Sequence, residues 1–354
     1  LVGKISALGL EIIIESGAGE KAGAPDSLYA AAGVTVTKDI SSALKEADIV
    51  ATLRPLSPEQ SKLLKKGAVT LSFLAPSADG EAIRALAAAG ATSLSFELVP
   101  RISRAQSMDA LTSQALCAGY RASLVAAELL PKFFPMLMTA AGTVQPANVV
   151  VLGAGVAGLQ AIATAKRLGA RVSAYDVRPA SADEVRSMGA TFIELELEAL
   201  EGAGGYAREM TEERAAKQRE LLTPYIAKSH VVITTAAVPG RQAPRLMTQA
   251  MVDSMAPGTI IVDLAAETGG NVEGSKPGEI VETSGGVRIW GGKDVPSQLP
   301  FHASFLYSRN VVNLLSLFTT PAKDDQKVAF NLDFEDEIIN GAAVTHAGAR
   351  RGAK

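Results

Sequence analysis

Short apolar runs alternate with amphipathic segments along the first hundred residues of the chain. Compact apolar runs indicate buried strands, and apolar residues three to four positions apart indicate helices. The predicted strands are Leu10–Glu15, Val34–Val36, Asp48–Thr52, Ala68–Ser72 and Thr92–Ser95. The predicted helices between them are Ser27–Ala32, Ser41–Ala47, Pro58–Lys65 and Gly80–Ala89. This alternation predicts a parallel α/β domain.

The same alternation returns after residue 147 and predicts a second α/β unit. Its predicted strands are Val149–Leu152, Arg171–Tyr175, Thr191–Glu194, His230–Thr234, Thr259–Leu264 and Gly285–Trp290. Its predicted helices are Gln160–Leu168, Ser181–Met188, Thr211–Ala227 and Pro244–Met255. A long helical pattern over Met108–Leu130 separates the two units and is expected to connect them.

The remaining segments complete the predicted organisation. Thr139–Pro146 is expected to be a loop, Ser304–Leu317 a helix, and Asn340-Gly341 the turn of a hairpin. Leu1–Leu8 resembles the end of a helix, so the strand that should precede it is apparently missing. We therefore expect the C-terminal tail to pack on the N-terminal domain.

These elements predict an α/β fold of two Rossmann-like parallel-sheet domains, joined by a long helix, with a cleft between them. Residues 1–110 would form the N-terminal domain, completed by residues 295–354. Residues 111–294 would form the second domain. Ligands of open parallel sheets bind beyond the carboxyl ends of the strands, so chemistry is expected there.

The strongest local motif follows the apolar run Val149–Leu152, where Gly153, Gly155 and Gly158 form a full G-x-G-x-x-G pattern. The first glycine permits a tight turn, the second lets a pyrophosphate approach the backbone, and the third lets helix and strand pack closely. The free N–H groups at the start of the following helix favour phosphate. This pattern predicts that residues 111–294 bind a dinucleotide.

The second strand of this unit ends at Asp176, which lies 18 residues after Gly158, where an acid is expected to bind the adenosine ribose. The motif in this context favours dinucleotide binding over a packing motif that binds nothing. A carboxylate repels a 2′-phosphate, so Asp176 favours NAD over NADP. Arg178 is two residues away and could soften that preference.

Composition narrows the classes of function. A net charge of −3 gives no basis for a nucleic-acid partner, and the 47% hydrophobic content is typical of a soluble globular protein. The chain shows no secretory signal and no uninterrupted apolar run of about 18 residues. Cys117 is the single cysteine, which excludes a disulfide framework, and a small buried side chain is expected there. No metal-ligand cluster is visible.

The acid–base groups of an ordinary dehydrogenase are also not visible. His230 begins a strand and is expected to be structural, and His346 in the tail is expected to be solvated. His302 is the one mild candidate for proton transfer.

Two loops carry further candidates. Residues 101–109 place two arginines, an amide and a carboxylate in one segment, which suits recognition of a carboxamide or ribose. The alternative is a solvated loop in which Asp109 caps the next helix. Tyr206 follows two glycines in an acidic stretch, 196–210, which could be a lid over an apolar ligand face or an ordinary disordered insertion.

These residues together resemble the NAD(H)-binding component of proton-translocating NAD(P) transhydrogenases. The blocks that carry the resemblance are Pro100–Leu111, Ala118–Arg121, Thr139–Val144, the glycine fingerprint, Gly204–Met210 and Val262–Ala265. The resemblance implies that Arg101, Gln106 and Asp109 reach the nicotinamide, with Thr112 as a nearby hydroxyl. It also implies cofactor contacts from Gly153, Gly155, Val156, Gly158, Asp176, Arg178, Tyr206, Ala236 and Ala265.

The resemblance implies direct hydride transfer between NADH held here and NADP(H) held by a partner component. A membrane proton-channel component would couple the reaction to proton translocation, and the chain would form a homodimer. It would lie in the cytoplasm, peripheral on the inner-membrane face, or on the matrix side of a mitochondrial membrane. Because only a hydride moves between nicotinamides, no acid–base residue is needed.

Alanine dehydrogenase is similar in fold and fingerprint and is the alternative. The lysine and histidine that such an enzyme uses fall at Leu53 and Phe73, which cannot transfer a proton. Arg54 is close enough to keep this alternative open. A third possibility is a regulatory NAD-binding domain without turnover.

Overall fold

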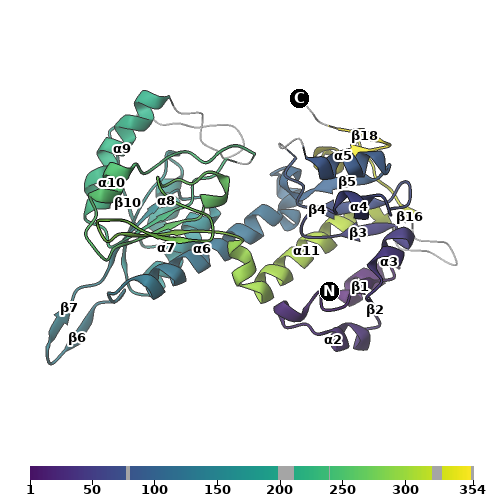
Figure 1. Cartoon of the computed structure of the whole chain (residues 1–354), viewed down its shortest axis with the longest axis horizontal. Helices are drawn as coiled ribbons and strands as arrows, with labels where there is room; N and C mark the ends of the chain where they lie inside the picture. The colour runs from purple at the N-terminus through teal and green to yellow at the C-terminus, as the bar shows by residue number, and fades with distance from the viewer. Residues whose placement is uncertain (77–79, 198–210, 239, 321–328, 352–354) are drawn as a thin grey trace. The chain divides into compact units, whose positions relative to one another are not determined.

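In the computed structural model the chain divides into two compact units, Leu1–Gln114 with Pro300–Lys354, and Ala115–Leu299 (Figure 1). The structure describes residues 1–76, 80–197, 211–238, 240–320 and 329–351. Helix α6 (Ala110–Leu129) carries the chain from the first unit into the second. Both units are α/β, as the hydrophobic pattern predicts.

The first unit contains a five-stranded sheet in the order β18-β17-β5-β4-β3. Strands β3, β4 and β5 are parallel, and the tail strand β17 pairs antiparallel with β5. These strands are β3 (Ile49–Ala51), β4 (Val69–Ser72), β5 (Thr92–Ser95), β17 (Ala343–His346) and β18 (Ala349–Arg350). A separate parallel pair contains β1 (Ile13–Glu15) and β2 (Thr35–Thr37), and a short antiparallel pair contains β15 (Thr319–Thr320) and β16 (Ala329–Phe330).

Seven α-helices belong to the first unit in its described residues, besides the start of α6. They are α1 (Val2–Ala7), α2 (Asp26–Ala31), α3 (Ile40–Glu46), α4 (Pro58–Ser61), α5 (Glu81–Ala88), α11 (Pro300–Phe318) and α12 (Glu337–Ala342). Leu71 and Leu94 of the sheet are fully buried and pack in one cluster with Phe318 of α11. A second cluster contains Ile83 and Leu86 of α5. The sheet is therefore covered by helices from both ends of the chain.

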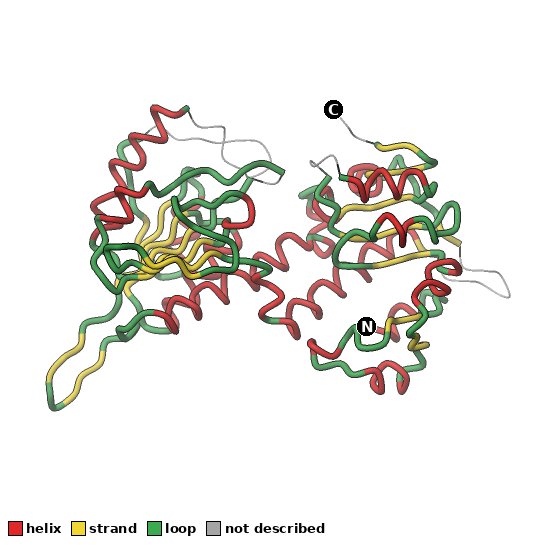
Figure 2. Tube along the Cα trace, viewed as in Figure 1, coloured by secondary structure: helices red, strands yellow, loops and turns green. Residues whose placement is uncertain are grey.

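The second unit is built on a seven-stranded sheet in the order β10-β9-β8-β11-β12-β14-β13, drawn as yellow strands in Figure 2. Its strands are β8 (Asn148–Leu152), β9 (Arg171–Tyr175), β10 (Thr191–Phe192), β11 (Val231–Thr234), β12 (Ile260–Asp263), β13 (Ile280–Glu282) and β14 (Arg288–Gly291). All pairings are parallel except that of β13 with β14. The six parallel strands have the order of a dinucleotide-binding sheet, which reverses between β8 and β11.

Strand β8 shows how the sequence positions this sheet. Val149 and Val151 pack in one apolar cluster with Ile162 of α7 (Val156–Arg167), together with alanines of α6. Val150 and Leu152 pack in another cluster, with α9 (Glu212–Ala227) and α10 (Gln249–Asp253). Helix α8 (Ser181–Ser187) follows β9. Because alternate residues face opposite sides of a strand, a continuous apolar run is needed where helices cover both faces.

Several predicted elements differ from the structure. Asn340-Gly341 lies in α12 rather than in a hairpin turn, because Ile338, Ile339 and Ala342 form a buried helical face. The hairpin lies further on, between β17 and β18, where Ala347 and Gly348 have φ values of 48° and 83°. Positive φ at both positions matches the tight turns that join antiparallel strands.

Four further corrections concern the second unit. Thr139–Pro146 is not a plain loop, because β6 (Leu137–Thr139) and β7 (Gly142–Val144) form a hairpin. Helix α10 is much shorter than the predicted Pro244–Met255, because Met247 pairs in a parallel bridge with Val272 and its carbonyl oxygen accepts the Glu273 N–H instead of a helical N–H. Strand β13 was not predicted, and α7 begins at Val156, four residues before the prediction.

Candidate functional site: a dinucleotide fingerprint and a separate polar segment

The three glycines of the turn between β8 and α7 differ in their surroundings. Gly153 has φ 98°, in the region that favours glycine. A Cβ on Gly158 would lie only 1.9 Å from the Gly153 carbonyl oxygen. A Cβ on Gly155 would meet nothing within 4 Å, although Gly155 has an ordinary φ of −74°. The first and third glycines therefore serve the fold, whereas the second leaves open space beside the backbone.

Helix α7 starts at this open space. Gly155 is its N-cap, and no side chain hydrogen-bonds to the cap. The N-terminal turn of a helix offers N–H groups and the positive end of the helix dipole to an anion. The geometry therefore fits a pyrophosphate at Gly155 and Val156, at the edge of the sheet where the strand order reverses.

Asp176 directly follows β9 and hydrogen-bonds back to the fingerprint. Its Oδ2 accepts a hydrogen bond from the Ala154 backbone N–H at 2.7 Å, and its Oδ1 accepts one from the Arg178 N–H at 2.9 Å. The Arg178 guanidinium also binds the carboxylate, with Nε 2.9 Å from Oδ1. This carboxylate raises the pKa of Arg178. The structure therefore brings Asp176 and Arg178 together beside the glycine turn.

Two further predicted positions, Ala236 and Ala265, follow the carboxyl ends of β11 and β12. Asp263, the last residue of β12, is fully buried and accepts hydrogen bonds from the Ala265 N–H at 3.0 Å and from Thr234 Oγ1 at 3.1 Å. It also accepts bonds from the N–H groups of Asn271 and of the next residue. A buried carboxylate with this many donors is well satisfied and fixes the loop around it.

Asn271 links this loop to the one that carries Ala236. Its side chain accepts a hydrogen bond from the Ala236 N–H at 3.0 Å and donates to the carbonyl oxygens of Ala236 and Pro244, each at 2.8 Å. Neither Asp263 nor Asn271 was predicted as a site residue. The signal that could have found Asp263 is a charged residue at the end of a wholly apolar strand.

The other predicted residues lie in the first unit. Arg101 and Gln106 are exposed, and Gln106 belongs to the 3₁₀ helix Ser103–Met108. Asp109 accepts hydrogen bonds from the Thr112 N–H at 2.9 Å and from Thr112 Oγ1 at 2.7 Å. Asp109 therefore does cap α6, as one of the two interpretations of this segment expects.

Two side chains of helix α11 fix the backbone of this polar segment. The side-chain amides of Asn310 and Asn313 both donate to the Ser107 carbonyl oxygen at 2.9 Å. At the other side, the Arg104 guanidinium forms an ion pair with Asp336, at 2.6 Å. The exposed Gln106 is thus carried on a backbone that is fixed on both sides. Tyr206, the predicted lid residue, lies outside the described residues.

Two of the three histidines, His230 and His346, have structural surroundings. His230 Nδ1 accepts a hydrogen bond from the Asn148 N–H at 2.8 Å, and burial together with Lys132 lowers the pKa of His230. The expectation that His346 is solvated was wrong: it is half-buried, with its ring 4.5 Å from that of Phe334 and Nδ1 2.9 Å from Thr92 Oγ1. His302 is exposed, beside Phe301.

Burial raises the pKa of Cys117, which disfavours the reactive thiolate.

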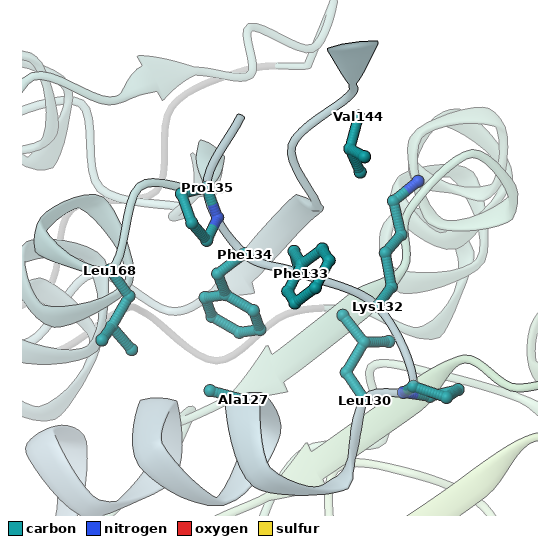
Figure 3. Close-up of a pocket in the computed structure, with 9 residues that line it drawn as sticks. Ala127, Leu130, Lys132, Phe133, Phe134, Pro135, Val144 and Leu168 are labelled. Atoms are coloured by element: carbon teal, nitrogen blue, oxygen red, sulfur yellow. The ribbon is translucent and has the colours of Figure 1, made fainter. Parts of the chain in front are cut away.

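A cavity of about 740 Å³ lies in the second unit (Figure 3). Its lining includes Ala127 and Leu130 at the end of α6, Phe133, Phe134, and Leu168 at the end of α7. Because the glycine turn is at the opposite, N-terminal end of α7, this cavity is not the dinucleotide site.

Among the described residues, no group of three or more histidines, cysteines and acids could hold a metal. No helix in the described parts of the chain is long and apolar enough to cross a membrane.

Comparisons with known proteins agree with this geometry. Residues 1–118 match the family described as "Alanine dehydrogenase/PNT, N-terminal domain", and residues 122–351 match its C-terminal domain. An NAD(P) transhydrogenase alpha subunit of Rhodospirillum rubrum is 46% identical over 357 residues, covering 99% of this chain and 92% of that protein. The alanine dehydrogenase of Mycolicibacterium smegmatis is 31% identical and covers 78% of this chain and 70% of that protein.

Solved structures give the same relationship. A transhydrogenase from Sinorhizobium meliloti has a TM-score of 0.85 at 42% identity and covers 99% of this chain and 93% of that one. An L-alanine dehydrogenase has a TM-score of 0.77 at 23% identity, covering 100% and 92% respectively, and so shares the fold. The chain belongs to the alanine dehydrogenase/PNT family, and its similarity to the NAD(P) transhydrogenase alpha subunits exceeds its similarity to the alanine dehydrogenases.

Proposed function

We propose that this chain is the NAD(H)-binding component of a proton-translocating NAD(P) transhydrogenase. The observation that carries the proposal is the open space at Gly155, at the start of α7, with Asp176 hydrogen-bonded to the same turn. The open space at Gly155 suits a pyrophosphate, and the carboxylate of Asp176 suits an adenosine ribose. The similarity to transhydrogenase alpha subunits supports the choice of reaction.

Bound NADH would supply a hydride to NADP⁺ held by a partner component. The chain's own residues would bind and orient the dinucleotide: the glycine turn would hold the pyrophosphate, and Arg101, Gln106, Asp109 and Thr112 would hold the nicotinamide end. A glutamine can hydrogen-bond a carboxamide without exchanging a proton. Because a hydride passes between two nicotinamides, positioning and exclusion of water would provide the catalysis.

Alanine dehydrogenase is the second candidate, and the local chemistry disfavours it. At one of the two positions where a proton-transfer residue would be expected, Phe73 stacks on Tyr307, with ring centroids 5.6 Å apart. Burial raises the pKa of Tyr307, whose hydroxyl donates to the Thr52 carbonyl oxygen at 2.6 Å. At the other position, Leu53 has no titratable group. This aromatic cluster therefore suits packing rather than proton transfer.

The partners that the sequence resemblance implies are an NADP-binding component, a membrane proton-channel component and a second copy of the chain. The β6–β7 hairpin supports a protein contact, because Met138 in β6 is 82% exposed and Met136, just before β6, is 53% exposed. We place the chain in the cytoplasm, on the inner-membrane face, or on the matrix side in a mitochondrion.

The test combines the purified chain with an NADP-binding component and NADH that carries deuterium at C4 of the nicotinamide. We expect deuterium to appear in NADPH and not in water. Gln106→Asn should slow this transfer at least about tenfold while NADH affinity changes little, and Asp176→Ala should weaken NADH binding. Gln60→Asn, an amide in the α4 cap of the same unit, is the matched control for Gln106.

Two results would contradict the proposal. Reduction of NAD⁺ that depends on alanine, with the chain alone, would favour the alanine dehydrogenase alternative. NADH binding without transfer to any NADP-binding component would favour a regulatory domain. Equal losses of affinity and rate in Gln106→Asn would indicate that this residue only binds.

A further inference from the structure

The carboxylate of Asp176 is already fully engaged in the described structure. Its Oδ1 accepts hydrogen bonds from the Arg178 backbone N–H and from Arg178 Nε, both at 2.9 Å. Its Oδ2 accepts bonds from the Ala154 N–H at 2.7 Å and from the Arg178 Nη2 at 3.1 Å. An ionised carboxylate offers about four acceptor positions, so these four donors occupy all of them.

The four donors divide into two kinds. The two N–H groups of Ala154 and Arg178 belong to the backbone of the glycine turn and of the loop after β9, so they stay with the fold. The other two belong to one guanidinium, which binds one nitrogen to each carboxylate oxygen. A planar guanidinium matches a carboxylate in this two-pronged geometry. The guanidinium therefore occupies the two acceptor positions of the carboxylate that the backbone N–H groups do not use.

A ribose diol needs the same two positions. Its adjacent hydroxyls are two neighbouring donors, and a carboxylate in this place of the fold accepts from them. The diol and the guanidinium cannot both occupy them. The Arg178 side chain is 25% exposed and that of Asp176 is 8% exposed, so the arginine is the more exposed partner and the one that a bound ribose would displace.

We propose that Arg178 determines nucleotide specificity at this site by competing with the ribose for Asp176. Binding of a dinucleotide with a free 2′-hydroxyl displaces the guanidinium, so the resident ion pair weakens NADH binding. The displaced cation stays near the ribose, because it is attached two residues after Asp176, and there it attracts a 2′-phosphate. Arg178 thus lowers the affinity for NADH and raises the affinity for NADPH, so the difference between the two affinities becomes smaller. This inference rests on the proposed function, since it assumes that the adenosine ribose binds at Asp176.

A residue that only contacts a bound nucleotide leads to a different expectation. An arginine that simply contacts the ligand should lose affinity for both nucleotides when it is replaced. A competing arginine should instead gain affinity for one nucleotide and lose it for the other. The sign of the change in NADH affinity therefore separates the two roles.

The test measures binding of NADH and NADPH to Arg178→Gln by calorimetry on the whole chain. We expect the Kd of NADH to fall about two- to fivefold, the size of the effect of a partly exposed ion pair, and the Kd of NADPH to rise at least about tenfold. Arg186→Gln is the matched control, because Arg186 pairs with Asp183 and Glu194 in the same βα unit and should alter neither Kd.

Arg178→Lys provides a second variant that keeps the charge but lacks the two-pronged geometry. It should tighten NADH binding while it retains NADPH binding. Weaker or unchanged NADH binding in Arg178→Gln, with the native melting temperature, would overturn the inference. If wild-type protein binds NADH and Asp176→Ala weakens that binding, such a result overturns only the role of Arg178. If the wild-type protein binds neither nucleotide, the proposed function itself fails.

Discussion

The fingerprint glycines allow the fold and the binding site to be separated with one type of substitution. In Gly158→Ala the new Cβ would lie 1.9 Å from the Gly153 carbonyl oxygen and 3.2 Å from Thr235 Oγ1. An ordinary contact between carbon and oxygen is about 3.3–3.6 Å, so α7 would have to move by roughly 1.5 Å. Overpacking of this kind costs about 1–3 kcal/mol, which corresponds to a melting temperature lower by about 3–10 °C.

Gly155→Ala should behave in the opposite way. The new Cβ meets nothing within 4 Å, and the φ of −74° suits alanine. The loss of freedom in the unfolded chain favours the variant, and the poorer N-cap disfavours it, so stability should change by less than about 0.5 kcal/mol. The methyl group would fill the space that a pyrophosphate needs, and NADH affinity should fall at least about tenfold, or about 1.4 kcal/mol.

Calorimetric melting and NADH titration of both variants give the answer. We expect a large loss of melting temperature with Gly158→Ala alone, and a loss of affinity without loss of stability with Gly155→Ala. If Gly155→Ala lowers the melting temperature as much as Gly158→Ala, the space beside Gly155 is not open. If it leaves NADH affinity unchanged, the pyrophosphate does not approach there.

Three further predictions concern residues around the site and the core of the second unit. Asn271→Ala should raise the KM for NADH about three- to tenfold, because it releases the loop that carries Ala236. The control is Thr345→Val, at a buried polar position of the other sheet, which should lower the melting temperature and leave the KM for NADH unchanged. Cys117 should react slowly with a thiol reagent in the native protein and rapidly after unfolding, because burial raises its pKa; fast native labelling would contradict its burial. The pKa of His230 lies below its ordinary value of 6.5 in the folded protein, so the unfolded chain takes up the additional proton as the pH falls. Stability should therefore decline from about pH 7 to about pH 5, and His230→Asn, which keeps an acceptor for the Asn148 N–H, should show a smaller decline in the free energy of unfolding.

The fingerprint could be predicted from sequence because each of its requirements is local. A buried strand, a tight turn and a helix follow one another within residues 148–167, and Asp176 comes at the end of the next strand. The α/β class was likewise predictable, because the apolar runs have the lengths of strands covered by helices on both faces.

The rest of the site depends on contacts that local patterns do not encode. Asp263 and Asn271 act through hydrogen bonds to loops that follow two different strands. The short α10 has the same cause, because the Glu273 N–H takes the Met247 carbonyl oxygen that a longer helix would have used. Asn340-Gly341 lies in a helix because the buried face of Ile338, Ile339 and Ala342 outweighs the local turn preference of that dipeptide.

The strands at the outer edges of the two main sheets are also the shortest in them. In the large sheet β10 has two residues and β13 has three, and in the other sheet β18 has two and β3 has three. A short edge offers few unpaired main-chain groups to another strand, which protects a folded chain against aggregation through its sheets. Any protein that assembles with this chain at these sheets must therefore recognise its side chains, because little main chain is left to extend them.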